Sequence, residues 1–149
     1  MNIQSTPMDA NNALLTEVYL NAKLGADALN TMLSKVGDQA FAQALQQQAA
    51  EYKQISDDAM TNLAQRGQAP SRKATVVQAE NCAEIHLATL INKTPSHLSQ
   101  MRMEDDMTGA IQVTRALHRY ANAEQPVKDL ADRLIQLQEG HIQALKSYL

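Results

Sequence analysis

The chain has 149 residues, of which 44% are hydrophobic, and its formal net charge is -3. This length allows one domain with a substantial core and is too short for two ordinary domains, so we expect a single domain over residues 1–149. A weakly acidic chain does not attract phosphate backbones or anionic lipids, which disfavours nucleic acid and membranes as partners.

The cysteine content and the N-terminal sequence predict a cytoplasmic protein. The lone cysteine, Cys82, cannot form an internal disulfide. The first residues, MNIQSTPMDANNALL, lack the charged and apolar regions of a secretory signal. No apolar run reaches the roughly 18 to 20 residues that span a bilayer.

The composition predicts an all-α fold, because Ala, Leu, Gln and Met are abundant while Gly, Pro and aromatic residues are few. Pro is favoured at the start of a helix and Gly just after its end. These residues divide the chain into five predicted helices: 7–36, 38–66, 71–92, 95–121 and 126–149. Thr6, Asp38, Ser71 and Thr94 are the predicted caps of the first four helices.

Apolar residues recur at steps of three and four in three of these segments, which is typical of helices with one buried face. The predicted stripe of the first is Leu15, Val18, Ala22, Gly25, Leu29, Met32 and Val36. That of the second is Phe41, Leu45, Gln48, Tyr52, Ile55 and Ala59. That of the last is Val127, Leu130, Leu134, Leu137, His141, Ala144 and Tyr148, widened by Leu145 and Leu149. The fourth helix gives a weaker stripe of Met103, Met107, Ala110, Thr114 and Leu117.

Two pairs of long helices, each joined by a short turn, predict an antiparallel four-helix bundle with the shorter segment 71–92 as an extra crossover helix. Gly25, Gly109 and Gly140 lie inside predicted helices, where each costs about 1 kcal/mol relative to Ala. Close approach of neighbouring helices would explain them.

With its helix lengths, its crossover and its ending LADRLIQLQEGHIQALKSYL, the chain resembles the ferritin-like superfamily, specifically small bacterial spore-coat-type and uncharacterised ferritin-like proteins. The resemblance runs from about Met8 to Leu149. Di-iron members of that superfamily use one Glu from each of two helices and a Glu-x-x-His pair from each of the other two. The resemblance therefore implies a mid-bundle metal site suited to oxygen chemistry.

The sequence departs from that ligand pattern, since it contains no Glu-x-x-His pair. The corresponding pair on the last helix is Gln138 and His141, and on the second helix Glu51 lies near glutamines. Folding the last two helices back around Glu124 brings Glu104 and Asp106 within a turn of the level of His141. The predicted metal ligands are Glu51, Glu104, Gln138 and His141, with Asp106 and Glu17 as further carboxylates.

Two interpretations of Gln138 and His141 follow. They form a buried polar pair that is hydrogen-bonded across the bundle, as buried polar groups must be. Alternatively they belong to a single-metal site completed by Glu51 and by Glu104 or Asp106. The first is the leading interpretation.

The other residues that could form functional sites also have structural interpretations. Cys82 and His86 lie four residues apart but are too few for a zinc site, which takes four ligands. Met103 and Met107 share a helix face and are expected to fill the core. The basic cluster Arg115, His118 and Arg119 is expected to be a solvated face near a helix C-terminus.

We therefore expect a non-catalytic bundle with a degenerate metal site that acts through protein interaction, self-association or a structural role such as that of a coat protein. Its expected partner is protein, including a homo-oligomer, and no cofactor is expected. The alternative is a metal-binding oxidoreductase or iron-handling protein that holds iron or another divalent metal. A third hypothesis is an adaptor whose helices exchange with partner helices.

Overall fold

The computed structural model describes residues 9–69 and 91–149. Within these ranges the chain forms four α-helices and no strand, which confirms an all-α bundle. The helices are α1 (Ala10–Leu33), α2 (Gln39–Gln65), α4 (Pro95–Arg119) and α5 (Gln125–Leu145), followed by a 3-10 turn at Lys146–Tyr148. The predicted start at Pro7 and nearly all of the predicted helix 71–92 lie outside the described residues.

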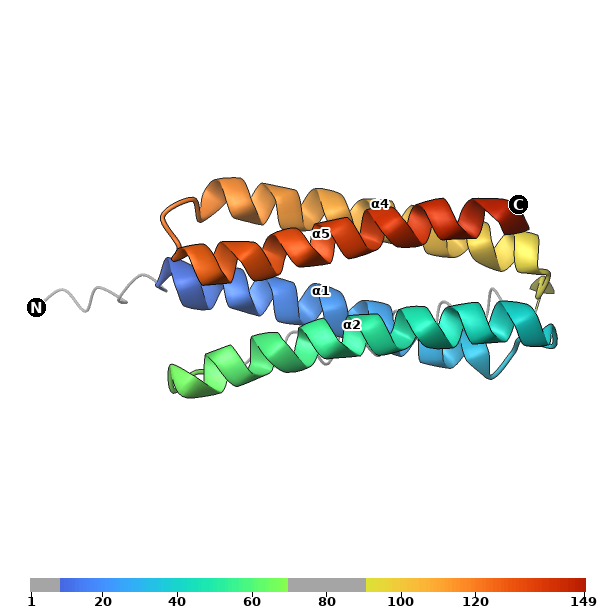
Figure 1. The fold of residues 1–149 in the computed structure, drawn as a ribbon, viewed down its shortest axis with the longest axis horizontal. Helices are drawn as coiled ribbons and strands as arrows, with labels where there is room; N and C mark the ends of the chain where they lie inside the picture. Colours follow the sequence, from blue (N-terminus) through green and yellow to red (C-terminus); the bar gives the residue numbers. More distant parts are fainter. Residues whose placement is uncertain (1–8, 70–90) are drawn as a thin grey trace, which may run out of the picture.

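The four helices lie side by side in an elongated bundle (Figure 1). The closest packing joins α1 to α2 and α4 to α5. The turn between α1 and α2 and the turn between α4 and α5 lie at opposite ends of the bundle (Figure 1). No helix in the described part of the chain combines the length and apolar character needed to cross a bilayer.

The predicted boundary residues act as expected at two helix starts and one helix end. The Asp38 carboxylate accepts a hydrogen bond of 2.8 Å from the Phe41 N–H, and the Thr94 hydroxyl accepts one of 3.2 Å from the His97 N–H. Both satisfy N–H groups that a helix start leaves unpaired. Gly67 follows α2 with a φ of +69°, a backbone conformation that glycine adopts without strain.

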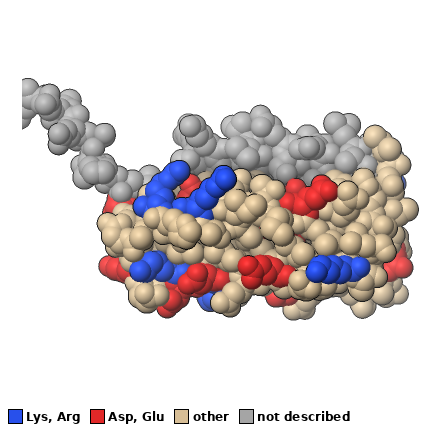
Figure 2. Space-filling view, turned by 90° about the horizontal axis from the view of Figure 1, so that it is seen from above, with Lys and Arg blue, Asp and Glu red and all other residues tan. Residues whose placement is uncertain are grey.

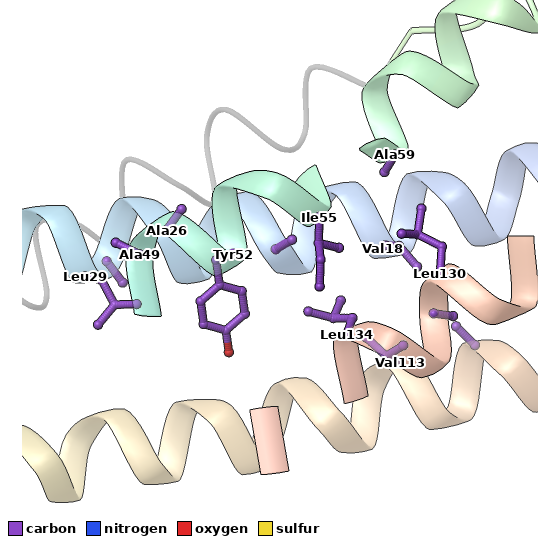
Figure 3. Packing of buried hydrophobic residues seen from close by; sticks show 14 of the residues in the cluster. Val18, Ala26, Leu29, Ala49, Tyr52, Ile55, Ala59, Val113, Leu130 and Leu134 are labelled. Atoms are coloured by element: carbon purple, nitrogen blue, oxygen red, sulfur yellow. The ribbon is translucent and has the colours of Figure 1, made fainter. Parts of the chain in front are cut away.

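Apolar side chains from all four helices form one buried core, part of which is drawn in Figure 3. Leu14, Leu15 and Leu63 are fully buried, as are Phe41 and Leu45. Every member of the predicted stripe of α2 is buried, and only Val36 of the first stripe is not. Burial of this apolar surface, at about 25 cal/mol per Å², is the main contribution to the stability of the fold.

The predicted stripe of α4 is largely wrong, because only Ala110 of its members is buried, while Met103 and Leu117 are partly buried against the core. The buried residues of α4 are Leu98, Ser99, Arg102, Asp106, Gly109, Ala110, Val113 and Ala116. Met107 is 51% exposed, so it does not fill the core as predicted. The stripe was missed because two charged residues, Arg102 and Asp106, occupy core positions, where apolar periodicity gives no signal.

The predicted stripe of α5 is partly wrong in its C-terminal half. Ala144 is exposed and Leu149 is 62% exposed, whereas Gln138 and Ile142 are buried. The stripe turns toward Gln138 because this side chain has hydrogen-bonding partners inside the bundle. The burial of His141 agrees with the prediction.

Candidate functional site

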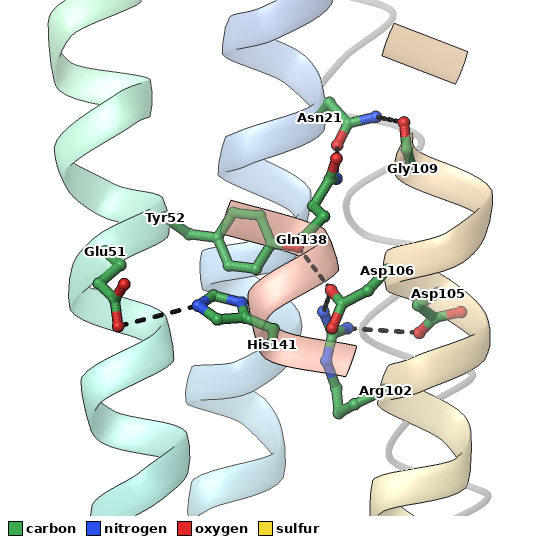
Figure 4. A network of polar contacts seen from close by, with 9 residues as sticks. All are labelled: Asn21, Glu51, Tyr52, Arg102, Asp105, Asp106, Gly109, Gln138 and His141. Atoms are coloured by element: carbon green, nitrogen blue, oxygen red, sulfur yellow. Dashed lines mark hydrogen bonds and ion pairs between the residues drawn. The ribbon is translucent and has the colours of Figure 1, made fainter. Parts of the chain in front are cut away.

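Polar side chains from all four helices meet in the middle of the bundle (Figure 4). We call them the polar cluster: Asn21 of α1, Tyr52 of α2, Arg102 and Asp106 of α4, and Gln138 and His141 of α5. All but Asn21 are almost fully buried. Polar groups at this depth are shielded from water, so they need hydrogen-bonding partners within the protein.

The strongest contacts in the polar cluster converge on one carboxylate. Asp106 Oδ1 accepts a hydrogen bond of 2.7 Å from an Arg102 guanidinium nitrogen and one of 2.5 Å from the Tyr52 hydroxyl. Arg102 and Asp106 are one turn apart on α4, so their side chains reach the same side of that helix. The second guanidinium nitrogen of Arg102 lies 3.4 Å from an oxygen of Asp105, at the surface. Arg102 and Asp106 thus form a buried ion pair, and the Tyr52 hydroxyl is hydrogen-bonded to its carboxylate.

Burial and the two charges of this pair shift the pKa values of Asp106, Tyr52 and Arg102. Burial raises the pKa of the Asp106 carboxyl, and the Arg102 charge opposes that shift. Burial and the neighbouring Asp106 charge raise the pKa of the Tyr52 phenol well above its ordinary value. Burial disfavours the Arg102 charge, but Asp106 and the other groups near it outweigh this and raise the pKa of the guanidinium. Tyr52 is thus a neutral donor at physiological pH.

Gln138 is held by hydrogen bonds between helices. Its amide nitrogen donates to Asn21 Oδ1 at 2.6 Å, and the Asn21 amide nitrogen donates to the Gly109 carbonyl at 3.2 Å. A Cβ atom at position 109 would overlap the Gln138 amide nitrogen and lie 2.9 Å from Asn21 Oδ1, so any larger residue here would displace these side chains. This confirms that Gln138 is a buried residue hydrogen-bonded across the bundle.

His141 is buried as predicted, but the predicted hydrogen bond across the bundle is wrong for this residue, since neither ring nitrogen has such a partner among the described residues. Its ring packs edge-on against Tyr52, with ring centroids 5.1 Å apart. Its Nε2 atom lies 3.8 Å from Glu51 Oε1, too far for a hydrogen bond, and neither ring nitrogen has a partner within the described residues. Burial and the nearby Arg102 charge lower the pKa of His141 to about 4. The imidazole is therefore neutral at physiological pH.

A surface pocket of about 410 Å³ between α2 and α5 opens beside His141. Gln48, Glu51 and Gly140 also line it. The Gln48 side-chain oxygen is buried with no hydrogen-bonding partner in the described structure. A smaller cavity of about 140 Å³ lies between α1 and α4, beside Arg102 and Gln138.

The structure brings together two of the four predicted metal ligands, Glu51 and His141. Gln138 lies one turn from His141 on α5, but its side chain is directed toward Asn21 (Figure 4). It does not bring Glu104 to them. Glu104 is exposed and its carboxylate accepts a hydrogen bond of 3.0 Å from Gln100 on the outer surface of α4. Asp106 occupies the interior position instead.

These donors do not fit a di-iron centre, which takes about six ligands, mostly carboxylates. One oxygen of Asp106 is occupied by Arg102 and Tyr52, and the Gln138 amide is neutral. Among the residues that the structure describes, no group of three or more His, Cys, Asp and Glu side chains gathers to hold a metal ion. The fixed positive charge of Arg102 would also repel a metal cation placed among these side chains.

The sequence interpretation missed Arg102, Tyr52 and Asn21 as members of the site. Tyr52 was expected only as a core residue, and Arg102 was not considered. A signal was present, since Arg102 and Asp106 are opposite charges four residues apart. That spacing also occurs on solvated helix faces, so the signal alone does not place the pair inside the core.

Comparisons with family models, curated proteins and solved structures find no match to this chain.

Proposed function

We propose that this protein is a non-catalytic, ferritin-like helical bundle that acts through protein contacts, as a self-associating or structural protein. The observation that carries this proposal is the buried Arg102–Asp106 pair at mid-bundle, with its nitrogen-to-oxygen distance of 2.7 Å. In a di-iron bundle, metal ions supply the positive charge that carboxylates from several helices surround. Here the guanidinium of Arg102 supplies that charge from within the chain.

The arrangement of the helices supports the ferritin-like part of the proposal. In Figure 1 the colours run in opposite directions along α1 and α2, and again along α4 and α5, but in the same direction along α2 and α4. The end of α2 and the start of α4 therefore lie at opposite ends of the bundle. Ferritin-like bundles share this arrangement, because a long connection joins two of their helices, unlike bundles joined only by short turns. The proposed fold is an antiparallel four-helix bundle with an extra crossover helix over residues 71–92.

The protonation states support the non-catalytic part. A general acid or base works best with a pKa near the operating pH. The pKa of His141 is lowered to about 4 and that of Tyr52 is raised well above its ordinary value, so neither changes its charge near neutral pH. One oxygen of the Asp106 carboxylate accepts hydrogen bonds from both Arg102 and Tyr52. This polar cluster is suited to holding four helices in register.

Metal analysis tests this proposal. The protein would be purified without chelator, then measured before and after incubation with ferrous iron, beside the variants His141→Ala and Glu51→Gln. We expect iron at background in all three proteins. One or two iron ions per chain, lost in His141→Ala, would overturn the proposal. The exposed variant His118→Ala serves as the control for adventitious surface binding by histidine.

A second candidate function is binding of iron or another divalent cation at the pocket between α2 and α5. It is favoured by the unpartnered nitrogens of His141, 3.8 Å from Glu51, and by the unpartnered oxygen of Gln48 nearby. Imidazole and carboxylate suit iron or zinc, and the amide oxygen would be an additional weak ligand. The predicted iron-handling or oxidoreductase activity would require this site. The same measurements decide between the two candidates, since metal binding here depends on both His141 and Glu51.

A further inference from the structure

The outer surface of α4 carries a regular stripe of residues that the core does not use. Its members are Gln100, Glu104, Met107, Ile111, Thr114 and His118, separated by alternating steps of four and three. This is the spacing of a helix that packs along another helix. All are exposed except Thr114, which is partly exposed. The stripe is about 27 Å long at the rise of an α-helix.

Apolar side chains lie at the centre of this stripe. Met107 is 51% exposed and Ile111 is 45% exposed, one turn apart on the same face of α4. Only two other large hydrophobic residues are as exposed within the described residues, Ile91 and Leu149, and neither belongs to α4. An exposed apolar centre with polar residues around it is the composition of a contact surface.

The stripe is symmetric about residue 109. Met107 and Ile111 lie at equal distances from that point, as do Glu104 and Thr114, and likewise Gln100 and His118. If a second copy of α4 is laid antiparallel on the first, each member of the stripe therefore meets another member of the stripe. A two-fold dimer requires this property, because the same patch must complement itself.

Charge on this face reverses along the helix. Glu104 precedes the apolar centre, and the basic residues Arg115 and Arg119 follow it. Figure 2, which looks onto the side of α4 and α5, shows separate basic and acidic groups with uncharged surface between them. In an antiparallel pair Glu104 of one copy lies level with Thr114 and Arg115 of the other. Glu104 accepts an exposed hydrogen bond of 3.0 Å from Gln100, which an ion pair with Arg115 of the second copy would replace.

We infer that α4 is the surface through which two copies of this chain associate, in an antiparallel, two-fold dimer centred on Met107 and Ile111. This inference rests on the part of the proposed function that assigns the protein an action through protein contacts, and it names the partner as a second copy. Because the apolar centre is small, the dimer is weak and reversible, and it forms as the protein concentration rises.

The test is the molar mass of the full chain by sedimentation equilibrium, from low to high micromolar concentration. We expect the wild-type protein to pass from monomer to dimer. Ile111→Lys places a charge in the centre of the contact and should raise the dissociation constant by at least about tenfold. Leu149→Lys is the matched control, because it changes an exposed hydrophobic residue outside the stripe. Helical circular dichroism would check that each variant folds.

A charge exchange tests the antiparallel arrangement itself. Glu104→Arg sets like charges opposite one another in both symmetric contacts and should weaken the dimer about fivefold. The double variant Glu104→Arg with Arg115→Glu restores opposite charges and should restore the wild-type dissociation constant within about twofold. Failure of the second change to rescue the first would overturn the antiparallel pairing.

Other outcomes also overturn the inference. These are a wild-type monomer at all concentrations, a dimer that Ile111→Lys leaves unchanged, or a dimer weakened equally by Leu149→Lys. The metal measurement is independent of this one: iron that depends on His141 would contradict the proposed function whatever the state of association. A monomer without iron would contradict only the dimer.

Discussion

The two ends of the bundle and its middle are stabilised in different ways. At the end formed by the α1–α2 turn, Met32, Phe41 and Leu45 are fully buried and need only close packing. At mid-bundle, Tyr52, Arg102 and Asp106 are buried as deeply, but their polar atoms require partners at fixed distances. Apolar burial is non-directional, whereas hydrogen bonds constrain the register of the helices that supply them.

The middle also contains most of the buried side-chain atoms that lack a hydrogen-bonding partner in the described residues. Asp106 Oδ2, Arg102 Nε, Gln138 Oε1 and both His141 ring nitrogens are buried without partners in the described structure. Each such atom costs about 1 to 3 kcal/mol unless a water molecule bridges it. The middle is therefore the weaker region and the ends are the stronger ones, and the following changes test that difference.

Loss of the charge of Asp106 should have the largest effect. Asp106→Asn preserves the shape of the side chain but leaves the Arg102 guanidinium buried without a counter-charge. We expect a loss of about 3 to 5 kcal/mol in the free energy of unfolding, measured with urea. Asp105→Asn is the control, because its carboxylate is 50% exposed and its contact with Arg102 is 3.4 Å long. A loss of less than about 1 kcal/mol is expected there.

Acid should lower the stability of the folded protein, because His141 at mid-bundle resists protonation in the folded state. Its pKa is about 4 in the folded protein and about 6.5 in the unfolded chain. Between these values the unfolded state binds more protons, so stability present above pH 6.5 falls as the pH drops toward 4. The contribution of His141 to this loss is about 3 kcal/mol.

The variant His141→Phe isolates that contribution, because it retains an aromatic ring against Tyr52 and cannot titrate. The difference in unfolding free energy between wild type and variant should shift in favour of the variant as the pH falls from 7 to 4. A difference that does not change with pH would show that His141 is not neutral and buried in the folded protein. The comparison also removes the opposing effect of Asp106, whose raised pKa favours the folded state in acid.

Substitution of Gly25 and Gly140 by alanine distinguishes the effect of close packing from that of helix propensity. A Cβ atom at Gly25 would lie 2.9 Å from the buried Tyr52 ring, whereas one at Gly140 would meet nothing within 4 Å. Gly25→Ala should cost about 1 to 3 kcal/mol, because the ring must shift. Gly140→Ala should stabilise the protein by about 0.5 to 1 kcal/mol, because alanine is the better helix former. Thermal unfolding of both would give melting temperatures that move in opposite directions.

The smallest effect is expected at the apolar end. Leu45→Met conserves volume and hydrophobicity at a fully buried position, so it should cost less than about 1.5 kcal/mol. A conservative change thus has little effect at the end but a large one at Asp106. Equal effects of Leu45→Met and Asp106→Asn in the same urea experiment would contradict the distinction between the two regions.

Much of the fold was predictable from the sequence because the ends of the bundle obey simple periodicity. The caps at Asp38 and Thr94 and the glycine at position 67 marked helix boundaries by local chemistry that does not depend on tertiary structure. The close approach at Gly25 was also expected, although Gly140 has no such contact.

The polar middle was only half predictable. Gln138 and His141 were correctly placed inside, because they interrupt an otherwise apolar stripe. Arg102 was missed, since burial of an arginine depends on partners on other helices that a single sequence does not position. The predicted involvement of Glu104 failed for a related reason: a charged residue one turn from the expected level can face inward or outward, and here the inward position belongs to Asp106.

A double-mutant cycle on the buried pair tests most directly whether Arg102 and Asp106 form a closed structural unit. Unfolding free energies would be measured for the wild type, Arg102→Met, Asp106→Leu and the double variant. We expect each single variant to lose about 3 to 5 kcal/mol and the double variant to lose much less than their sum, because it buries no unpaired charge. Additive losses would contradict the account, since they would mean that the two charges do not depend on each other.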